Sequence, residues 1–218
     1  MTESTTVTAQ EFFQAAYEHR YTWDADFPGY RCDITVKQAN EVYQGQIQIN
    51  HDLTTEVSGI TDETVKQSIE HQLRDIVTHR KRSTFANTHG KNTFTFGATD
   101  PSGAVEILVS GDAMGSNYKL RGKEICQVSR VMGPMAFVID TRAGLDTGKG
   151  YVATDYQATF RNSQTNQLIK VVNFQDTYSP VGNYHLLTKQ VIRSEENGQM
   201  TTTEFTFTNI QLLEPALV

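Results

Sequence analysis

The sequence predicts an α+β protein in which a large curled antiparallel sheet, an open or half barrel, packs on two amphipathic helices. Two segments repeat their apolar residues at helical spacing, and nearly every other segment alternates apolar and polar residues with period two. Short turns rich in Gly, Asn and Pro separate the alternating segments. Because no linker or change in composition interrupts the pattern, residues 1–218 are expected to form a single domain.

The first helix is predicted to begin after Thr8 and to end near Arg20. Thr8 and Glu11 have the spacing of a capping box, in which each side chain accepts a hydrogen bond from an amide at the helix start. The aromatic and apolar residues of this segment recur at helical spacing and are expected to pack on the sheet: Phe12, Phe13, Ala16 and Tyr17.

The second helix is predicted to follow Thr61 as its N-cap and to end near Arg82. Asp62 and Glu63 suit the positive end of the helix dipole. One face of this segment is apolar, formed by Val65, Ile69, Leu73, Ile76 and Val77. The predicted strands are 32–36, 43–49, 53–57, 93–97, 104–110, 117–121, 124–131, 135–141, 151–161, 168–178, 184–193 and 200–212.

Composition excludes several classes of protein. The 19 Lys and Arg against 25 Asp and Glu give a net charge of −6, which argues against a nucleic-acid partner. The two cysteines, Cys32 and Cys126, lie too far apart in sequence for a metal or redox motif. The N-terminal residues lack the pattern of a secretory signal, and no apolar run reaches the length of a membrane span. We therefore expect a cytoplasmic protein.

The sequence favours a non-enzymatic protein with no cofactor. No phosphate-binding loop, dinucleotide fingerprint or nucleophile elbow occurs. The six histidines show no metal-ligand spacing, and His71 and His79 lie more than two helical turns apart, so no metal site is predicted.

Two segments are candidates for binding. The segment 21–30 holds Trp23, Phe27 and Tyr30 and is followed by Arg31. Its rings either close one end of the sheet or form the rim of a cavity for an apolar ligand. At the end of the second helix, His79 and Arg80 belong to a basic run that either stabilises the helix end or binds an anion or an acidic partner.

The sequence resembles a family of uncharacterised proteins from cyanobacteria and plant plastids. The resemblance rests on Tyr21-Thr-Trp-Asp-x-x-Phe-Pro-Gly-Tyr30, the helix start at Gly59-Ile-Thr-Asp-Glu63, His79-Arg80 with Phe85, and Asp176-Thr-Tyr178 before Tyr184. It implies a photosynthetic lineage and no specific chemistry. The order of elements is also similar to the periplasmic lipoprotein carrier fold, whose incurved sheet takes acyl chains.

Two binding functions remain open, in addition to an enzyme, for which the sequence assembles no nucleophile, base and oxyanion donor. The first is binding of a small apolar or amphiphilic ligand within the curved sheet, with Trp23, Phe27 and Tyr30 at the mouth and Arg31, His79 or Arg80 meeting its polar end. The alternative is an interaction or assembly factor whose basic helix end docks an acidic protein partner.

Overall fold

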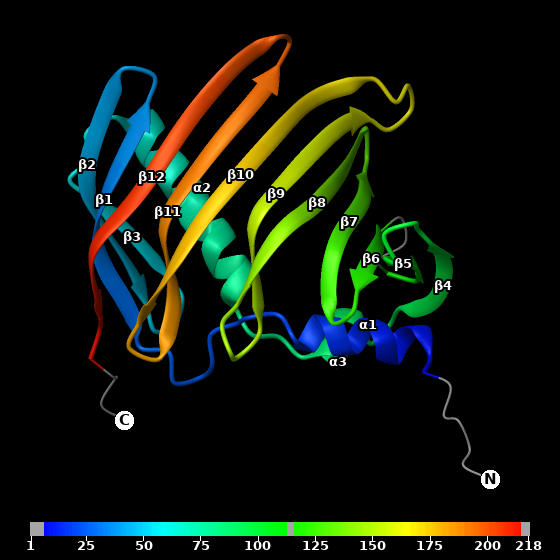
Figure 1. Cartoon of the computed structure of the whole chain (residues 1–218). Coiled ribbons are helices and arrows are strands. Elements are labelled where there is room, and N and C mark those ends of the chain that lie inside the picture. Colours follow the sequence, from blue (N-terminus) through cyan, green and yellow to red (C-terminus); the bar gives the residue numbers. More distant parts are fainter. Residues whose placement is uncertain (1–6, 113–115, 215–218) are drawn as a thin grey trace. The chain divides into compact units, whose positions relative to one another are not determined.

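The computed structural model describes residues 7–112 and 116–214, which form three helices and twelve strands (Figure 1). The helices are α1 (Ala9–Glu18), α2 (Glu63–Arg80) and α3 (Phe85–His89). The strands are β1 (Gly29–Gln38), β2 (Glu41–Asn50), β3 (Thr55–Ser58), β4 (Thr93–Thr99), β5 (Val105–Ser110), β6 (Ser116–Arg121), β7 (Glu124–Met132), β8 (Met135–Asp146), β9 (Tyr151–Asn162), β10 (Leu168–Val181), β11 (Tyr184–Glu196) and β12 (Gln199–Leu212).

The strands form one 12-stranded sheet in the order β3-β2-β1-β12-β11-β10-β9-β8-β7-β6-β5-β4. Apart from the β1–β12 pair, neighbours in this sheet are consecutive strands of the chain, as expected for strands joined by short turns. The consecutive strands β3 and β4, which α2 and α3 separate, are not neighbours. β3 and β4 end the order, so the sheet is open. A large, unclosed antiparallel sheet with few helices confirms the coarse prediction.

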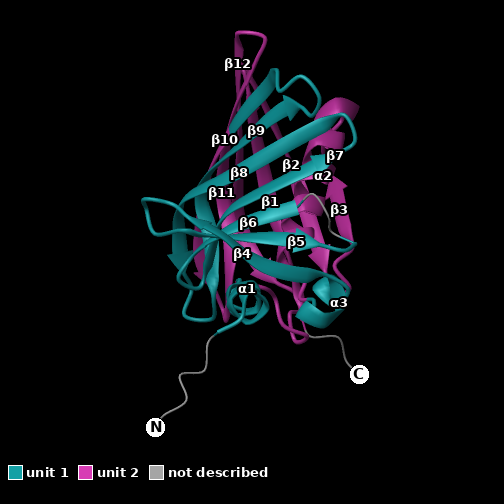
Figure 2. Cartoon of the chain, turned by 90° about the vertical axis from the view of Figure 1, so that its right-hand side faces the viewer, with its two compact units in different colours: residues 1–20, 83–172 teal, residues 21–82, 173–218 magenta. Residues whose placement is uncertain are grey.

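Contacts along the chain divide it into two compact units, shown in different colours in Figure 2. Unit 1 consists of residues 1–20 and 83–172, and unit 2 consists of residues 21–82 and 173–218. Each unit is therefore built from two stretches that are far apart in the sequence. The expectation of a single domain stays a prediction.

In unit 1, α1 covers an aromatic core. The capping box is confirmed, because the amide of Glu11 donates to Thr8 Oγ1 (3.2 Å) and that of Thr8 donates to Glu11 Oε2 (2.8 Å). Phe13 is fully buried, with its ring 4.5 Å from that of Tyr118 and 5.1 Å from that of Phe94, measured between centroids. The predicted aromatic face of α1 thus packs on strands β4 and β6.

In unit 2, α2 buries Val65, Ile69 and Leu73 and packs along β3. The close approach of β3 requires a glycine on β2. A Cβ atom at Gly45 would lie 2.5 Å from the carbonyl oxygen of Ser58 and 2.8 Å from the side chain of Ile60. Gly45 therefore fixes how closely the α2 segment joins the sheet.

Three local predictions differ from the structure. The N-cap of α2 is Asp62, whose Oδ1 accepts from the amide of Val65 (3.0 Å), and not Thr61. Leu53 lies in a turn with φ of 68° and is outside β3, which begins at Thr55. The short helix α3 was not predicted; Thr84 caps it by accepting from the amide of Asn87 (3.2 Å).

Candidate ligand-binding site

The segment between α1 and β1 brings together the aromatic rings that the sequence predicted to act together. Trp23 stacks on Phe27 with ring centroids 4.0 Å apart and an angle of 13° between the planes. Tyr30 and Tyr184 meet these rings edge-on, at 6.2 Å from Trp23 and 4.9 Å from Phe27 respectively. We call these four residues the aromatic cluster. Trp23, Phe27 and Tyr30 are only 1–3% exposed, so their rings form a closed group, and a role in ligand binding stays a prediction.

Arg80, at the end of α2, points back toward this segment. Its Nη1 donates to the carbonyl oxygen of Tyr21 (3.1 Å) and its Nη2 donates to the hydroxyl of Tyr178 (3.1 Å). The backbone also joins the two segments, because the amide of Trp23 donates to the carbonyl oxygen of Arg80 (2.8 Å). The structure therefore places Arg80 beside the aromatic cluster, as the ligand hypothesis requires.

A buried polar network continues from Arg80 onto β10 and β11. The Tyr178 hydroxyl donates to Asp176 Oδ2 (3.2 Å), and Gln190 Nε2 donates to Asp176 Oδ1 (2.8 Å). Asp176 and Gln190 are both buried. Burial raises the pKa of the Tyr178 hydroxyl to about 12, so the hydroxyl stays protonated and can donate to the carboxylate. We call Arg80, Tyr178, Asp176 and Gln190 the polar network.

Two buried polar atoms of unit 2 have no hydrogen-bond partner among the described residues: Trp23 Nε1 and Gln190 Oε1. The Gln190 amide is oriented by its neighbour, because its nitrogen donates to Asp176 Oδ1 and its oxygen therefore faces away from that bond. One unsatisfied donor thus belongs to the aromatic cluster, and one unsatisfied acceptor belongs to the polar network.

Two of the predicted site residues lie apart from this arrangement. Arg31 is exposed on β1, where its Nη2 donates to Gln211 Oε1 (3.0 Å) on β12. The side chain of His79 is exposed on α2, and its backbone carbonyl oxygen accepts from Arg80 Nη1 (3.2 Å). Trp23, Phe27, Tyr30 and Arg80 are therefore the predicted residues that the structure brings together.

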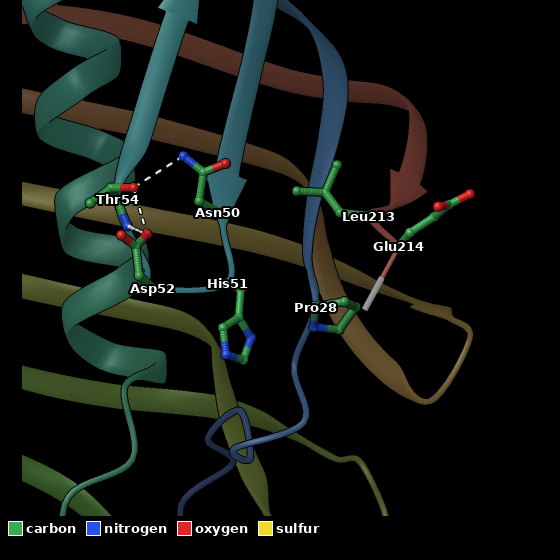
Figure 3. Close-up of a pocket in the computed structure, with 7 residues that line it drawn as sticks. All are labelled: Pro28, Asn50, His51, Asp52, Thr54, Leu213 and Glu214. Atoms are coloured by element: carbon green, nitrogen blue, oxygen red, sulfur yellow. Dashed lines mark hydrogen bonds between the residues drawn. The ribbon is translucent and has the colours of Figure 1, made fainter. Parts of the chain in front are cut away.

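A surface pocket of about 350 Å³ lies next to the aromatic segment of unit 2 (Figure 3). It is lined by Pro28, Asn50, His51, Asp52, Thr54, Leu213 and Glu214. Its polar side chains bind one another: Asn50 Nδ2 donates to Thr54 Oγ1 (3.0 Å), which donates to Asp52 Oδ1 (2.6 Å). The hydrogen bonds that Asp52 accepts from the hydroxyl and from the amide of Thr54 lower the pKa of its carboxyl group. Because polar groups of this pocket are already paired with each other, the pocket gives weaker support for a ligand site than the two unpaired buried atoms do.

The sequence reasoning missed the contribution of β10 and β11. Asp176 and Tyr178 are named in the sequence only as part of the family resemblance, and Gln190 was not predicted as a site residue. Asp176 and Tyr178 are two residues apart, so they face the same side of β10, and an acidic residue on a half-buried strand was the available signal. Their meeting with Arg80 depends on tertiary structure, which periodicity does not reveal.

Solved structures with similarity to this chain have low sequence identity and low TM-scores. A DUF1329 family protein from Desulfovibrio piger is 8% identical, with a TM-score of 0.29, over 98% of this chain and 96% of that chain. A putative outer membrane lipoprotein-sorting protein domain from Vibrio parahaemolyticus is 7% identical, with a TM-score of 0.28, over 96% and 94%. A chain of the Pseudomonas aeruginosa MucA/MucB complex is 10% identical, with a TM-score of 0.24, over 94% of each. TM-scores this low assign neither a ligand nor a partner to this chain.

The family comparison covers almost the whole sequence. No curated protein gives a match. Residues 4–213 match the family described as "Protein of unknown function (DUF3386)", which fits the uncharacterised family expected from the resemblance. The cyanobacterial and plastid origin stays a prediction. Since the match spans far more than half of its length, the chain belongs to the DUF3386 family.

Proposed function

We propose that this protein is a non-enzymatic binding protein that takes a small amphiphilic molecule in unit 2. The polar end of the ligand would meet the polar network, and its apolar part would lie against the aromatic cluster. A ligand that carries a hydroxyl group offers both a donor for Gln190 Oε1 and an acceptor for Trp23 Nε1. This proposal includes the expectation that the sheet is curled.

The observation that carries the proposal is the pair of unsatisfied buried atoms. Leaving a buried donor or acceptor without a partner costs about 1–3 kcal/mol per group, so such atoms are rare in folded proteins. Here two of them occur in the same unit and on residues that contact a continuous polar network. A ligand that supplies both partners would recover this cost on binding.

The raised pKa values of two groups that could act as nucleophiles, Cys32 and Tyr30, support binding over catalysis. Burial raises the pKa of the Cys32 thiol to about 12, so the thiol is not poised to form a nucleophilic thiolate. Burial likewise raises the pKa of the Tyr30 hydroxyl. These groups suit an apolar environment better than a catalytic one.

The aromatic segment provides the means of entry in this proposal. Residues 21–28 contain no helix and only an isolated bridge between Trp23 and Lys81, so few backbone hydrogen bonds hold them. A ligand can reach the buried atoms only when this segment moves, since the rings themselves are buried. Binding is therefore expected to be slow relative to diffusion.

The test uses Trp23, the only tryptophan of the chain, as its probe. Delipidated protein is titrated with oleyl alcohol and, in parallel, with squalene, which has a long apolar chain but no polar group. We expect a saturable change in tryptophan emission with oleyl alcohol and a much weaker one with squalene. Gln190→Leu should weaken the oleyl alcohol response by about 10-fold, the loss of one buried hydrogen bond.

The matched control is Gln44→Leu, which makes the same chemical change at an exposed position of β2 and should bind oleyl alcohol as the wild type does. Organic extraction of protein purified from its native host, followed by mass spectrometry, should yield a bound amphiphile. Clean extracts together with an unchanged tryptophan emission would show that water fills these sites and would overturn the proposal.

The alternative proposal is an assembly factor that docks an acidic partner on the basic end of α2. The specific support is the exposure of Lys81 and Arg82, which follow the helix, whereas Arg80 binds within unit 2. Reversing the charge of Arg82 should then abolish a pull-down that Trp23→Ala leaves intact. Weaker ligand binding in Gln190→Leu, which keeps the Trp23 probe, with an unchanged pull-down would separate the two functions.

A further inference from the structure

Two hairpins of unit 1, β7–β8 and β9–β10, have their turns at the same end of the strands (Figure 1). Both turns carry exposed apolar side chains. The five residues concerned are 36% to 55% exposed: Val131, Met132, Met135, Leu168 and Ile169. Isolated exposed apolar residues are common on proteins, but five at the end of two neighbouring hairpins need an explanation. We call these five residues the apolar tip.

The two turns are joined by hydrogen bonds, so the residues of the apolar tip lie at one end of the strands. The amide of Ser163, in the β9–β10 turn, donates to the carbonyl oxygen of Pro134 (2.9 Å), and its hydroxyl donates to that of Gly133 (2.8 Å). The register continues this link, because Met135 pairs with Asn162 and Ala136 pairs with Arg161. The hairpins therefore present their ends together.

Both faces of the β7–β8 hairpin are apolar at its end. Met132 pairs with Met135, so these two side chains share one face, whereas Val131 pairs with Ala136 and lies on the other. A protein partner that lies on one face of a sheet would leave the other face in water. A medium that surrounds the end of the hairpin, such as the outer part of a lipid layer, covers both.

The charges around the apolar tip have one sign. Residues 128–139 and 156–172 contain Arg130, Arg161 and Lys170 and no Asp or Glu, in a chain whose net charge is −6. Their contacts given by the structure are neutral: Arg130 Nε donates to Ser116 Oγ (3.0 Å), Arg161 Nη1 donates to the carbonyl oxygen of Asn166 (3.0 Å), and Lys170 Nζ lies 5.4 Å from the ring centroid of Phe160. This local excess of positive charge complements an anionic surface.

We propose that the apolar tip docks unit 1 on an anionic lipid surface. The apolar side chains enter the boundary between headgroups and acyl chains, while the three cations stay at the level of the headgroups. The proposed contact is one of surface association; among the described residues, no helix could serve as a membrane span. It is independent of the ligand proposed for unit 2, because none of its residues belongs to the polar network or the aromatic cluster.

The test is flotation of the full chain with lipid vesicles. We expect binding to vesicles of phosphatidylcholine mixed with phosphatidylglycerol, weak binding to phosphatidylcholine alone, and a decrease of binding as salt is raised. The double variant M132S/M135S should lower binding to the anionic vesicles by about 10-fold or more, because it removes two apolar side chains from the lipid. Circular dichroism should show an unchanged fold, since both residues are exposed.

Met200→Ser is the matched control. Met200 is also an exposed methionine at a hairpin turn, β11–β12, but it pairs with Glu195 and neighbours Glu196. This variant should float with the anionic vesicles as the wild type does. No binding of the wild type, equal binding to neutral vesicles, or equal loss in Met200→Ser and M132S/M135S would each overturn the proposal.

Discussion

Arg80 shows how one residue can join segments that are distant in the sequence. Its guanidinium donates to the Tyr21 carbonyl and to the Tyr178 hydroxyl, and a basic residue at a helix end is also favoured by the helix dipole. Stabilisation of the helix end, which the sequence offers as one role of Arg80, therefore accounts for only part of what this residue does. The neighbouring Arg82 is exposed and offers a direct comparison.

Replacing Arg80 with Met is expected to lower the free energy of unfolding by about 1–3 kcal/mol, because the Tyr21 carbonyl and the Tyr178 hydroxyl each lose a charged donor. Arg82→Met should change it by less than about 0.5 kcal/mol. Urea denaturation of both variants measures the difference. Equal midpoints for the two variants would show that the bonds of Arg80 add nothing to stability.

At the scale of single elements, the start of β1 depends on a glycine. Gly29 has φ of 85°, and a Cβ atom there would overlap the carbonyl oxygen of Ile49 and lie 2.9 Å from the carbonyl carbon of Asn50, both on the neighbouring strand β2. We expect Gly29→Ala to destabilise the protein by about 3 kcal/mol or more, since it adds a clash to the strain of the left-handed backbone.

Gly103→Ala separates these two contributions. Gly103 has φ of 81°, but a Cβ atom there would meet no atom within 4 Å. Its replacement should therefore cost only the backbone strain, about 1–2 kcal/mol. Thermal melts of the two variants give the comparison, and a similar loss in both would mean that β2 moves aside at no cost.

The helix α3 carries a histidine whose protonation opposes folding. His89 is buried among the rings of Phe13, Tyr17 and Phe85, and burial together with the charges of Arg20 and Arg130 lowers its pKa from 6.5 to about 4. Between these pH values the unfolded chain binds a proton that the folded chain does not. The stabilisation is therefore complete above pH 6.5 and is lost as the pH falls toward 4.

His89→Phe keeps an aromatic ring at this position and removes the titration. We expect the wild type to lose about 1–3 kcal/mol of unfolding free energy between pH 6.5 and 4 beyond what the variant loses. Denaturant unfolding at several pH values measures both, and the carboxyl groups common to the two proteins cancel in the difference. Parallel pH profiles would mean that His89 is protonated in the folded state.

Elements with strong periodicity could be predicted from the sequence, and those set by a few local bonds could not. The capping box of Thr8 located the start of α1, and alternation located the strands to within a few residues. α3 has five residues and no periodicity, so only the Thr84 cap marked it. In the candidate site, the aromatic rings were predictable as a group, but the polar network joins α2 to β10 and β11 through side chains that no local pattern links.

At the scale of the whole molecule, the path of the chain bears on the number of domains. The chain passes between the two units after Arg20, after Arg82 and after Val172, and the last passage falls inside strand β10. Neither unit is therefore formed by one continuous stretch of the sequence. A chain with this connectivity is expected to unfold cooperatively, as a single domain would.

Calorimetry of the wild type should accordingly show one transition, with equal calorimetric and van't Hoff enthalpies. Gly29→Ala perturbs unit 2 and low pH acts through His89 in unit 1, so both should shift this same transition. Gly103→Ala, in unit 1, serves as a milder perturbation of known direction. Two transitions, of which Gly29→Ala moves only one and low pH only the other, would establish two independently folding domains and refute the expectation that residues 1–218 form one.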